Sequence, residues 1–308
     1  MVVDAASSRL FVPCPDTGAV LVLSASTGSQ IGSIAVDSPQ AVELAGSQLW
    51  VGSRDNPTLF VFDVSGAGTN FPTIAQVTLP AANAVGLKYV QQVRLVFLGV
   101  EGAFLAVDVE THKIRGPAKS PGAFTGLDVD VADSSKYIIA TGYNNHVVWV
   151  NTGRWYIEVD MGPLPPSFPA PRCLYFDDEY NMILVSDSAT GAFLAINADA
   201  LKVEVDFVLS GVSNQTALWV DDSEKKGLRR VYSVGAGNAT SPAGVSVYEQ
   251  RAAKLYLPLG FAQTSAHAAV NVASCLDATH RRLFLAQDGM LMVFNLNQTA
   301  NTNSGTAV

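Results

Sequence analysis

A short apolar strand preceded by a polar residue recurs along the whole chain of 308 residues. Its copies begin at Arg9, Gln48, Arg94, Lys136, Asn181, Arg230 and Arg282, so neighbouring copies start 39 to 52 residues apart. A second apolar run follows each copy after a turn, and these runs begin at Val20, Leu59, Phe104, Val147, Phe193, Val245 and Leu291. No segment shows the apolar i, i+3, i+4, i+7 spacing of a packed helix. A repeat of about 45 residues with strand patterning predicts an all-β array of four-stranded units.

This period favours a seven-bladed β-propeller, with four-stranded antiparallel blades around a central channel. We expect one domain over residues 1–308, with blades at approximately 1–37, 38–80, 81–120, 121–170, 171–210, 211–261 and 262–308. The first and last blades are expected to be incomplete. Residues 1–4 resemble only the end of a strand, and the residues after Asn295 are polar.

An Asp or Asn follows the second apolar run directly in five copies. These residues are Asp63, Asp108, Asn151, Asn197 and Asn295. A short Asx side chain can accept a hydrogen bond from the backbone two residues on, and so close the next turn. We interpret both strands and this corner as scaffold.

The repeated strand, turn, strand and corner resemble the YVTN-type seven-bladed propellers, a family similar to the lactonase-like propellers. Phe11-Val12-Pro13-Cys14 stands where that family has Tyr-Val-Thr-Asn, and Ala25-Ser26-Thr27-Gly28 matches its corner. The resemblance covers the whole chain and implies the fold. Because propellers host many unrelated activities, function must be argued from the loops.

Charge and hydropathy exclude two classes of partner. The net charge of -8 and the pI of about 4.9 disfavour nucleic acid, which requires a basic surface. The apolar runs are shorter than the roughly 18 residues that a membrane-spanning helix needs. We therefore expect no nucleic acid, no membrane insertion and a monomer.

The cysteines and the glycosylation sequons bear on the compartment. Cys14, Cys173 and Cys275 fall in three different predicted blades, so three free thiols are expected. Sequons begin at Asn214, Asn238 and Asn297, although roughly two would arise by chance in a chain of this composition. Together with a possible trimmed signal peptide, the sequons favour an extracellular or periplasmic protein over a cytoplasmic one, without settling the compartment.

The strands of each blade are named A to D in chain order. Because antiparallel strands alternate in direction, the B–C turns and the D–A connections emerge at one end of the blades; we name this end the long-loop face. Its longest connections are expected at residues 161–172, 235–244 and 258–269. Long loops on a rigid scaffold are the usual place for binding residues.

Polar side chains on this face are the candidate ligand-binding residues. They are Arg172, His267, Gln40, Asn83, Gln215, His146 and Asp187. Arg172 ends a proline-rich stretch, and its guanidinium suits a carboxylate, phosphate or sugar acid. His267 can donate to the same anion or accept a proton from water. The alternative is that loop tips are polar because they are hydrated, with Arg172 paired to Asp187.

A metal site is the second candidate. Asp128 and Asp130 lie two residues apart on one predicted strand, and with Asn83 and Asn271 they offer oxygen ligands for Ca²⁺ or another divalent metal. The competing interpretation is an arginine-paired or hydrated edge of the channel. No compact zinc motif and no G-x-S-x-G elbow is present, so the cofactor stays open.

Two functions remain open at this point. The first is a non-catalytic binding propeller that uses the long-loop face for a small molecule, a glycan or a protein. The alternative is a lactonase-like hydrolase, with a metal-assisted or His-assisted site at the channel mouth. The sequence does not decide whether the protein is an enzyme.

Overall fold

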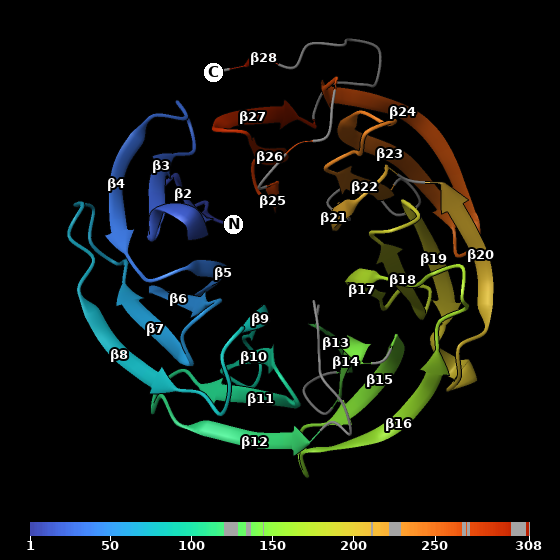
Figure 1. Cartoon of the computed structure of the whole chain (residues 1–308), viewed down its shortest axis with the longest axis horizontal. Coiled ribbons are helices and arrows are strands. Elements are labelled where there is room, and N and C mark those ends of the chain that lie inside the picture. The colour runs from blue at the N-terminus through green and yellow to red at the C-terminus, as the bar shows by residue number, and fades with distance from the viewer. Residues whose placement is uncertain are drawn as a thin grey trace. The chain divides into compact units, whose positions relative to one another are not determined.

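The computed structural model describes residues 1–119, 129–133, 137–143, 145–210, 212–221, 229–266, 269, 272–296 and 306–307. The chain divides into two compact units, Met1–Asp160 and Met161–Val308. The described residues form seven four-stranded antiparallel sheets, each with its strands in chain order (Figure 1). The prediction of an all-β chain with four-stranded antiparallel sheets is confirmed.

Four sheets begin in the first unit. Sheet 1 consists of β1 (Val2–Asp4), β2 (Arg9–Cys14), β3 (Ala19–Ser24) and β4 (Gln30–Ala35). Sheet 2 consists of β5 (Pro39–Ala45), β6 (Gln48–Ser53), β7 (Thr58–Asp63) and β8 (Thr73–Thr78). Sheet 3 consists of β9 (Val85–Val90), β10 (Leu95–Val100), β11 (Ala103–Asp108) and β12 (Ile114–Lys119). Sheet 4 consists of β13 (Val129–Asp133), β14 (Tyr137–Tyr143), β15 (His146–Asn151) and β16 (Tyr156–Pro163).

Three sheets lie in the second unit. Sheet 5 consists of β17 (Pro171–Asp177), β18 (Met182–Asp187), β19 (Ala192–Asn197) and β20 (Val205–Ser210). Sheet 6 consists of β21 (Gln215–Asp221), β22 (Arg229–Gly235), β23 (Ala243–Ala252) and β24 (Leu255–Ser265). Sheet 7 consists of β25 (Ala273–Asp277), β26 (Arg282–Gln287), β27 (Met290–Asn295) and β28 (Thr306–Ala307). Two short 3-10 turns, η1 (Pro15–Thr17) and η2 (Ala198–Ala200), complete the described elements.

The first and last sheets each contain one short strand pairing. β1 pairs with β2 over three residues, Val2 to Asp4. β28 pairs with β27 only at Met292↔Ala307 and Val293↔Thr306.

The predicted Asx corners are present between the third and fourth strands. The Oδ1 atoms of Asp63, Asp108, Asn151 and Asn197 each accept a hydrogen bond from the backbone N–H two residues on, at 2.8 to 3.1 Å. The residue two positions after Asn295 lies outside the described residues. The short polar side chain thus stabilises the turn without a long-range partner.

A second feature of the corner is a left-handed residue four positions after the end of the third strand. Gly28, His112, Trp155 and Leu201 occupy this position with φ between 52° and 74°. Gly28 matches the family corner, whereas two of the bulky residues contact the neighbouring sheet. Trp155 packs on Phe97 and His112 packs on Trp50, with ring centroids 6.2 and 5.7 Å apart. These ring contacts help to offset the strain of a left-handed backbone, which non-glycine residues rarely adopt.

The core lies between neighbouring sheets, because both faces of most strands are apolar. In the first unit, sheets 2 and 3 pack through the fully buried Trp50, Leu59, Leu98 and Leu105. In the second unit, Phe193 of sheet 5 meets Tyr248 of sheet 6 edge-on, with ring centroids 5.3 Å apart. Full burial of such a side chain contributes roughly 1.5–3 kcal/mol. None of the helices in the described residues is long and apolar enough to cross a membrane.

Candidate functional site

The long-loop face is tied together by backbone hydrogen bonds within each unit. In the first unit, Arg54 N donates to Ser38 O at 2.9 Å, and Asn83 N donates to Arg54 O at 3.0 Å. In the second unit, Ser188 N donates to Ala170 O at 2.9 Å. In each of these pairs a B–C turn meets a D–A connection, so the two sets of loops share one end of their sheets, as strand alternation predicts. The loops are therefore held in place before any ligand arrives.

A β-bulge recurs where the first strand of a sheet leaves this face. The register shifts between Pro39 and Ala41 in β5, between Pro171 and Leu174 in β17, and between Gln215 and Ala217 in β21. A shift at the same end of β9 lies between Val85 and Lys88. The side chains inside the bulges of β5, β17 and β21 include Gln40, Arg172 and Thr216. A bulge re-aims a side chain, and bulges are frequent beside functional sites. Two of the three residues were predicted from sequence; Thr216 was not.

Gln40 and Asn83 are brought together in the first unit. Gln40 Nε2 donates to Asn83 Oδ1 at 2.7 Å and to the carbonyl of Ala84 at 3.0 Å. Asn83 has a φ of 61°, a left-handed conformation that Asn tolerates better than most residues. Both side chains are partly buried. The pair fixes the connection between sheets 2 and 3.

Asp187 and Gln215 are buried in the second unit and hold the loops. The Asp187 carboxylate accepts hydrogen bonds from Ala170 N at 2.7 Å and from Thr190 N at 2.7 Å. It also accepts one from Thr190 Oγ1 at 2.9 Å. Gln215 Nε2 donates to Gly191 O at 2.9 Å, and its buried Oε1 has no hydrogen-bond partner among the described residues. Both residues position backbone; neither is exposed.

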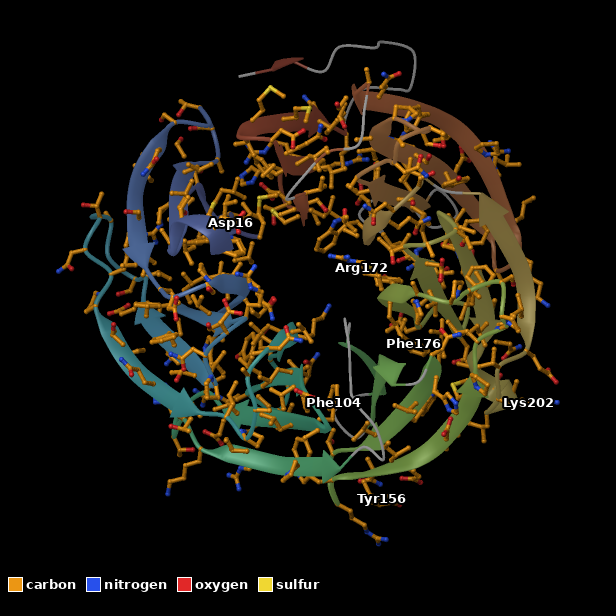
Figure 2. All side chains as sticks on the ribbon, viewed as in Figure 1. Asp16, Phe104, Tyr156, Arg172, Phe176 and Lys202 are labelled. Carbon is orange, nitrogen blue, oxygen red and sulfur yellow. The ribbon has the colours of Figure 1, made fainter. Side chains whose placement is uncertain are left out.

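Arg172 differs from these residues because it is exposed. It lies at the start of β17, and Figure 2 shows its side chain extending away from the other strands of its own sheet. It forms no ion pair with any residue that the structure describes, so the predicted alternative of an Arg172–Asp187 pair is not found. The preceding loop is ordered by the buried Leu164 and Phe168 and by a turn from Phe168 N to Pro165 O of 2.7 Å.

His146 is paired with a carboxylate in the first unit. It starts β15, and its Nδ1 lies 2.7 Å from Asp160 Oδ1 on β16. The imidazole is partly exposed, and the carboxylate is more exposed than the ring. A carboxylate at Nδ1 fixes the orientation and tautomer of an imidazole.

Three predicted residues, His267, Asp128 and Asn271, lie outside the described residues. Asp130 lies on β13, but its side chain is not among those described. Within the described ranges, no group of three or more His, Cys, Asp or Glu side chains could hold a metal ion. The Ca²⁺ site therefore stays a prediction.

The expected long connections are shorter than predicted in two places. β16 extends to Pro163 and β24 extends to Ser265, so residues 258–265 are strand and not loop. Prolines in the stretch favoured a loop interpretation, but a fourth strand lies at the edge of its sheet, where proline is tolerated. The loop predicted at 235–244 lies between β22 and β23, which end and begin at Gly235 and Ala243.

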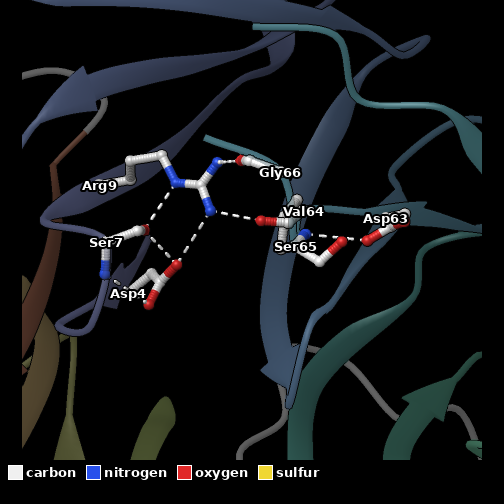
Figure 3. A network of polar contacts seen from close by, with 7 residues as sticks. All are labelled: Asp4, Ser7, Arg9, Asp63, Val64, Ser65 and Gly66. Carbon is white, nitrogen blue, oxygen red and sulfur yellow. Dashed lines mark hydrogen bonds and ion pairs between the residues drawn. The ribbon is translucent and has the colours of Figure 1, made fainter. Parts of the chain in front are cut away.

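Sequence reasoning missed a network of polar contacts at the opposite end of sheets 1 and 2 (Figure 3). Arg9 Nη2 lies 3.2 Å from Asp4 Oδ2 and also donates to Val64 O, and Arg9 Nη1 donates to Gly66 O at 2.8 Å. Ser7 donates to the same Asp4 carboxylate. The Arg9 side chain thereby links sheet 1 to the C–D corner of sheet 2. Arg230 makes the equivalent bond from sheet 6 to Leu296 O of sheet 7 at 3.1 Å.

A second missed cluster is buried between sheets 5 and 6. Arg229 Nη1 lies 2.5 Å from Asp177 Oδ1, and Gln250 Nε2 donates to Asp177 Oδ2 at 2.9 Å. Arg229 Nη2 also donates to the hydroxyl of Tyr175 at 3.3 Å. The signal for these clusters was present in the sequence, because an Asp ends the first strand and an Arg begins the second in several sheets.

All three cysteines belong to the described residues, and none of them forms a disulfide, as predicted. Burial raises the pKa of the Cys275 thiol to about 12 and raises the pKa of the half-buried Cys14 above its ordinary value. A thiol is reactive as its thiolate, so a raised pKa lowers the reactivity of both thiols.

Comparisons with known proteins support the fold. No family model matches the chain, and no curated protein matches it. The crystal structure of a candidate 6-phosphogluconolactonase from Bacteroides fragilis NCTC 9343 is similar, with a TM-score of 0.72 and 11% identity over 99% of this chain and 95% of that chain. The β-propeller domain of Cps50 (Swd1) from Myceliophteria thermophila matches with a TM-score of 0.63 and 13% identity over 88% of this chain and 84% of that chain. At these identities the likeness concerns the fold alone: the chain is an all-β propeller.

Proposed function

We propose that this protein is a binding propeller that recognises its ligand on the long-loop face, and that its seven sheets are seven blades of one domain around a common axis. The observation that carries the proposal is the β-bulge shared by β5, β17 and β21. The same shift is present in β9, so the bulge occurs at the long-loop end of four of the described first strands. Loops held by backbone hydrogen bonds surround it. A rigid rim with re-aimed side chains lowers the entropic cost of binding.

The exposed Arg172 indicates that the ligand carries a negative charge. Asp187, which is paired with Pro171 across the sheet, accepts hydrogen bonds from the backbone of Ala170 and Thr190, so Arg172 is available to an anion. A planar guanidinium binds carboxylates and phosphates through two parallel hydrogen bonds. Because the chain carries a net charge of -8, a small ligand fits better than a strongly anionic polymer. We therefore favour a small molecule with a carboxylate, a phosphate or a sugar-acid group, ahead of a glycan or a protein.

A second candidate function is lactone hydrolysis at the same face. Two observations favour it: the similarity of fold to the candidate 6-phosphogluconolactonase, and the His146–Asp160 pair. A carboxylate at Nδ1 leaves Nε2 as the basic nitrogen that can activate a water molecule. A divalent metal bound by Asp128, Asp130 and Asn271 would provide the alternative means of activation.

A thermal-shift screen against small carboxylates, sugar acids and sugar phosphates tests the binding proposal. A ligand at 100 times its Kd stabilises the folded protein by about 2.7 kcal/mol, which raises the melting temperature measurably. We expect Arg172→Ala to abolish the shift. The matched control is Arg154→Ala, which removes an exposed arginine from a corner at the other end of sheet 4.

Two outcomes would contradict this proposal. A ligand-induced shift that survives in Arg172→Ala places the site elsewhere. Turnover of δ-gluconolactone by the wild type that is lost in His146→Ala favours the hydrolase over the binding function.

A further inference from the structure

We infer that Asn238, on the turn between β22 and β23, is a site of N-linked glycosylation. The sequence Asn238-Ala239-Thr240 is an N-x-T sequon, and all three residues are exposed. A glycan acceptor must lie on an accessible loop of the protein. This turn meets that condition without any rearrangement of the strands beside it.

The geometry of the turn leaves the reacting atom available. Asn238 Oδ1 accepts hydrogen bonds from Thr240 N at 2.9 Å, from Thr240 Oγ1 at 3.0 Å and from Ser241 N at 2.8 Å. The amide nitrogen Nδ2, which would carry the glycan, donates to no residue in the described part of the chain. A sugar on Nδ2 therefore displaces none of these contacts.

Gly237 keeps the turn in this shape. Its φ is 70°, and a Cβ atom at this position would lie 2.6 Å from Ala243 N and from Ser241 O. Only glycine fits such a close approach in a left-handed conformation. The close backbone packing at Gly237 keeps residues 238–240 outside the paired part of β22 and β23.

The sequon at Asn214 is a poorer acceptor. Its middle residue, Gln215, is fully buried and bonded to Gly191 O, and its third residue, Thr216, already belongs to β21. A glycosyltransferase could bind this sequon in an extended conformation only if the start of β21 separated from β22. Asn297 lies outside the described residues. Asn238 is thus the better acceptor of the two described sequons.

The transfer requires a donor that the protein itself does not supply. The donor class is an oligosaccharide linked through pyrophosphate to a lipid carrier. A bond forms between Asn238 Nδ2 and C1 of the first sugar, while the bond from C1 to the pyrophosphate oxygen breaks. The lipid pyrophosphate leaves with the electron pair, and Nδ2 loses one proton.

The position links this modification to the long-loop face. Ala236 N donates to Asn214 O and Gly237 N donates to Ser213 O, both at 3.0 Å, so the turn is part of that face in sheet 6. A glycan here would crowd the sheet-6 side, leaving the sheet-5 side around Arg172 for a small ligand.

Peptide mass spectrometry of the protein isolated from the organism that makes it tests the inference. We expect the peptide with Asn238 to carry a hexosamine-containing glycan, and peptide-N-glycosidase to convert Asn238 to Asp. An unmodified Asn238, or a glycan confined to Asn214 or Asn297, would overturn the inference.

Variants made in the same organism separate the sequon from the fold. Thr240→Ala is expected to abolish the glycopeptide, whereas Thr240→Ser keeps the sequon and should retain it. A glycopeptide that persists in Thr240→Ala would contradict a sequon-dependent site. Neither result depends on Arg172 or on a bound ligand, so this inference and the binding proposal fail separately.

Discussion

Arg9 and Arg229 both begin the second strand of a sheet and both are buried, with 5% and 3% of their surface exposed. Arg9 binds the Asp4 carboxylate of its own sheet and two backbone carbonyls of the next sheet. Arg229 binds the fully buried carboxylate of Asp177 in the preceding sheet. Arg230, not Arg229, is the residue that matches Arg9 in the register of the first two strands. Arg229 stands one position earlier, and the two arginines Arg9 and Arg229 stabilise different contacts between sheets.

The difference lies in what surrounds each guanidinium. Around Arg9, Asp4 is partly exposed and Gly66 is exposed, so water can replace the guanidinium at these two partners, whereas Val64 is buried. Around Arg229, both Asp177 and Gln250 are fully buried, and Gln250 Oε1 has no partner among the described residues. Removing one member of a buried charged pair leaves its partner charged and unsolvated, whereas a carbonyl at a wet edge recovers its hydrogen bond from water. The Arg229 cluster should accordingly be the more sensitive of the two.

The largest effect is expected from Asp177→Asn. The substitution keeps the shape of the side chain but removes the charge that balances Arg229. We expect a loss of about 3–5 kcal/mol in the free energy of unfolding, measured by urea denaturation. Glu179→Gln is the control, since Glu179 lies 3.8 Å from the same guanidinium but is 43% exposed, and it should cost less than about 1 kcal/mol.

A double variant sharpens this result. Asp177→Leu combined with Arg229→Met removes both charges together, and such replacements are often neutral or stabilising. The double variant should recover most of the stability that Asp177→Asn loses. If it is as unstable as the single variant, packing at Asp177 and not charge balance explains the loss.

A smaller effect is expected from Arg9→Ala at the wet joint. The variant loses bonds to Val64 and Gly66 and two cation–π contacts, with the guanidinium carbon 5.8 and 5.7 Å from the rings of Phe11 and Phe71. We expect a loss of about 1–3 kcal/mol by the same urea measurement. Arg9→Lys keeps the charge but not the forked geometry, so an intermediate loss should follow. A loss for Arg9→Ala that exceeds the loss for Asp177→Asn would reverse the comparison.

Much of the scaffold could be predicted from the sequence because its signals are local. The seven copies of the strand pair mark the second and third strands of all seven sheets, and the Asx corners of Asp63, Asp108, Asn151 and Asn197 form as expected. Backbone bonding two residues along the chain needs no knowledge of the neighbouring sheet. Alternation of strand direction likewise grouped the B–C turns with the D–A connections.

The roles of single polar residues could not be predicted in this way, because they depend on contacts between distant residues. Asp187 was placed among the ligand candidates by its position after a strand, yet it is buried and holds Ala170 and Thr190. The bulge that contains Arg172 arises from a shift in the register between β17 and β18, and the sequence of a single strand does not reveal such a shift. The alternation of β22 explains why Arg229 and Arg230 reach opposite neighbours, but only the packed sheets show which neighbour each one meets.

The smallest effect concerns the pH dependence of the Arg9 joint. Burial raises the pKa of Asp4, but hydrogen bonds from Ser7 and Arg9 outweigh this and lower the pKa below its ordinary value of 3.8. A carboxyl whose pKa is depressed on folding stabilises the folded state above its unfolded pKa, and this contribution is lost as the pH falls through the folded pKa.

Comparing the wild type with Asp4→Asn measures this contribution. At pH 7 the variant should be less stable by about 1 kcal/mol, since it loses a partly solvated ion pair and its hydrogen bonds. As the pH falls below 3.8 and then through the lowered pKa of folded Asp4, the carboxyl becomes protonated, so the difference in melting temperature should shrink towards zero. A difference that stays constant from pH 7 to the acid limit would show that Asp4 acts through shape alone. Charge would then contribute to stability at the buried Arg229 cluster and not at the partly hydrated Arg9 network.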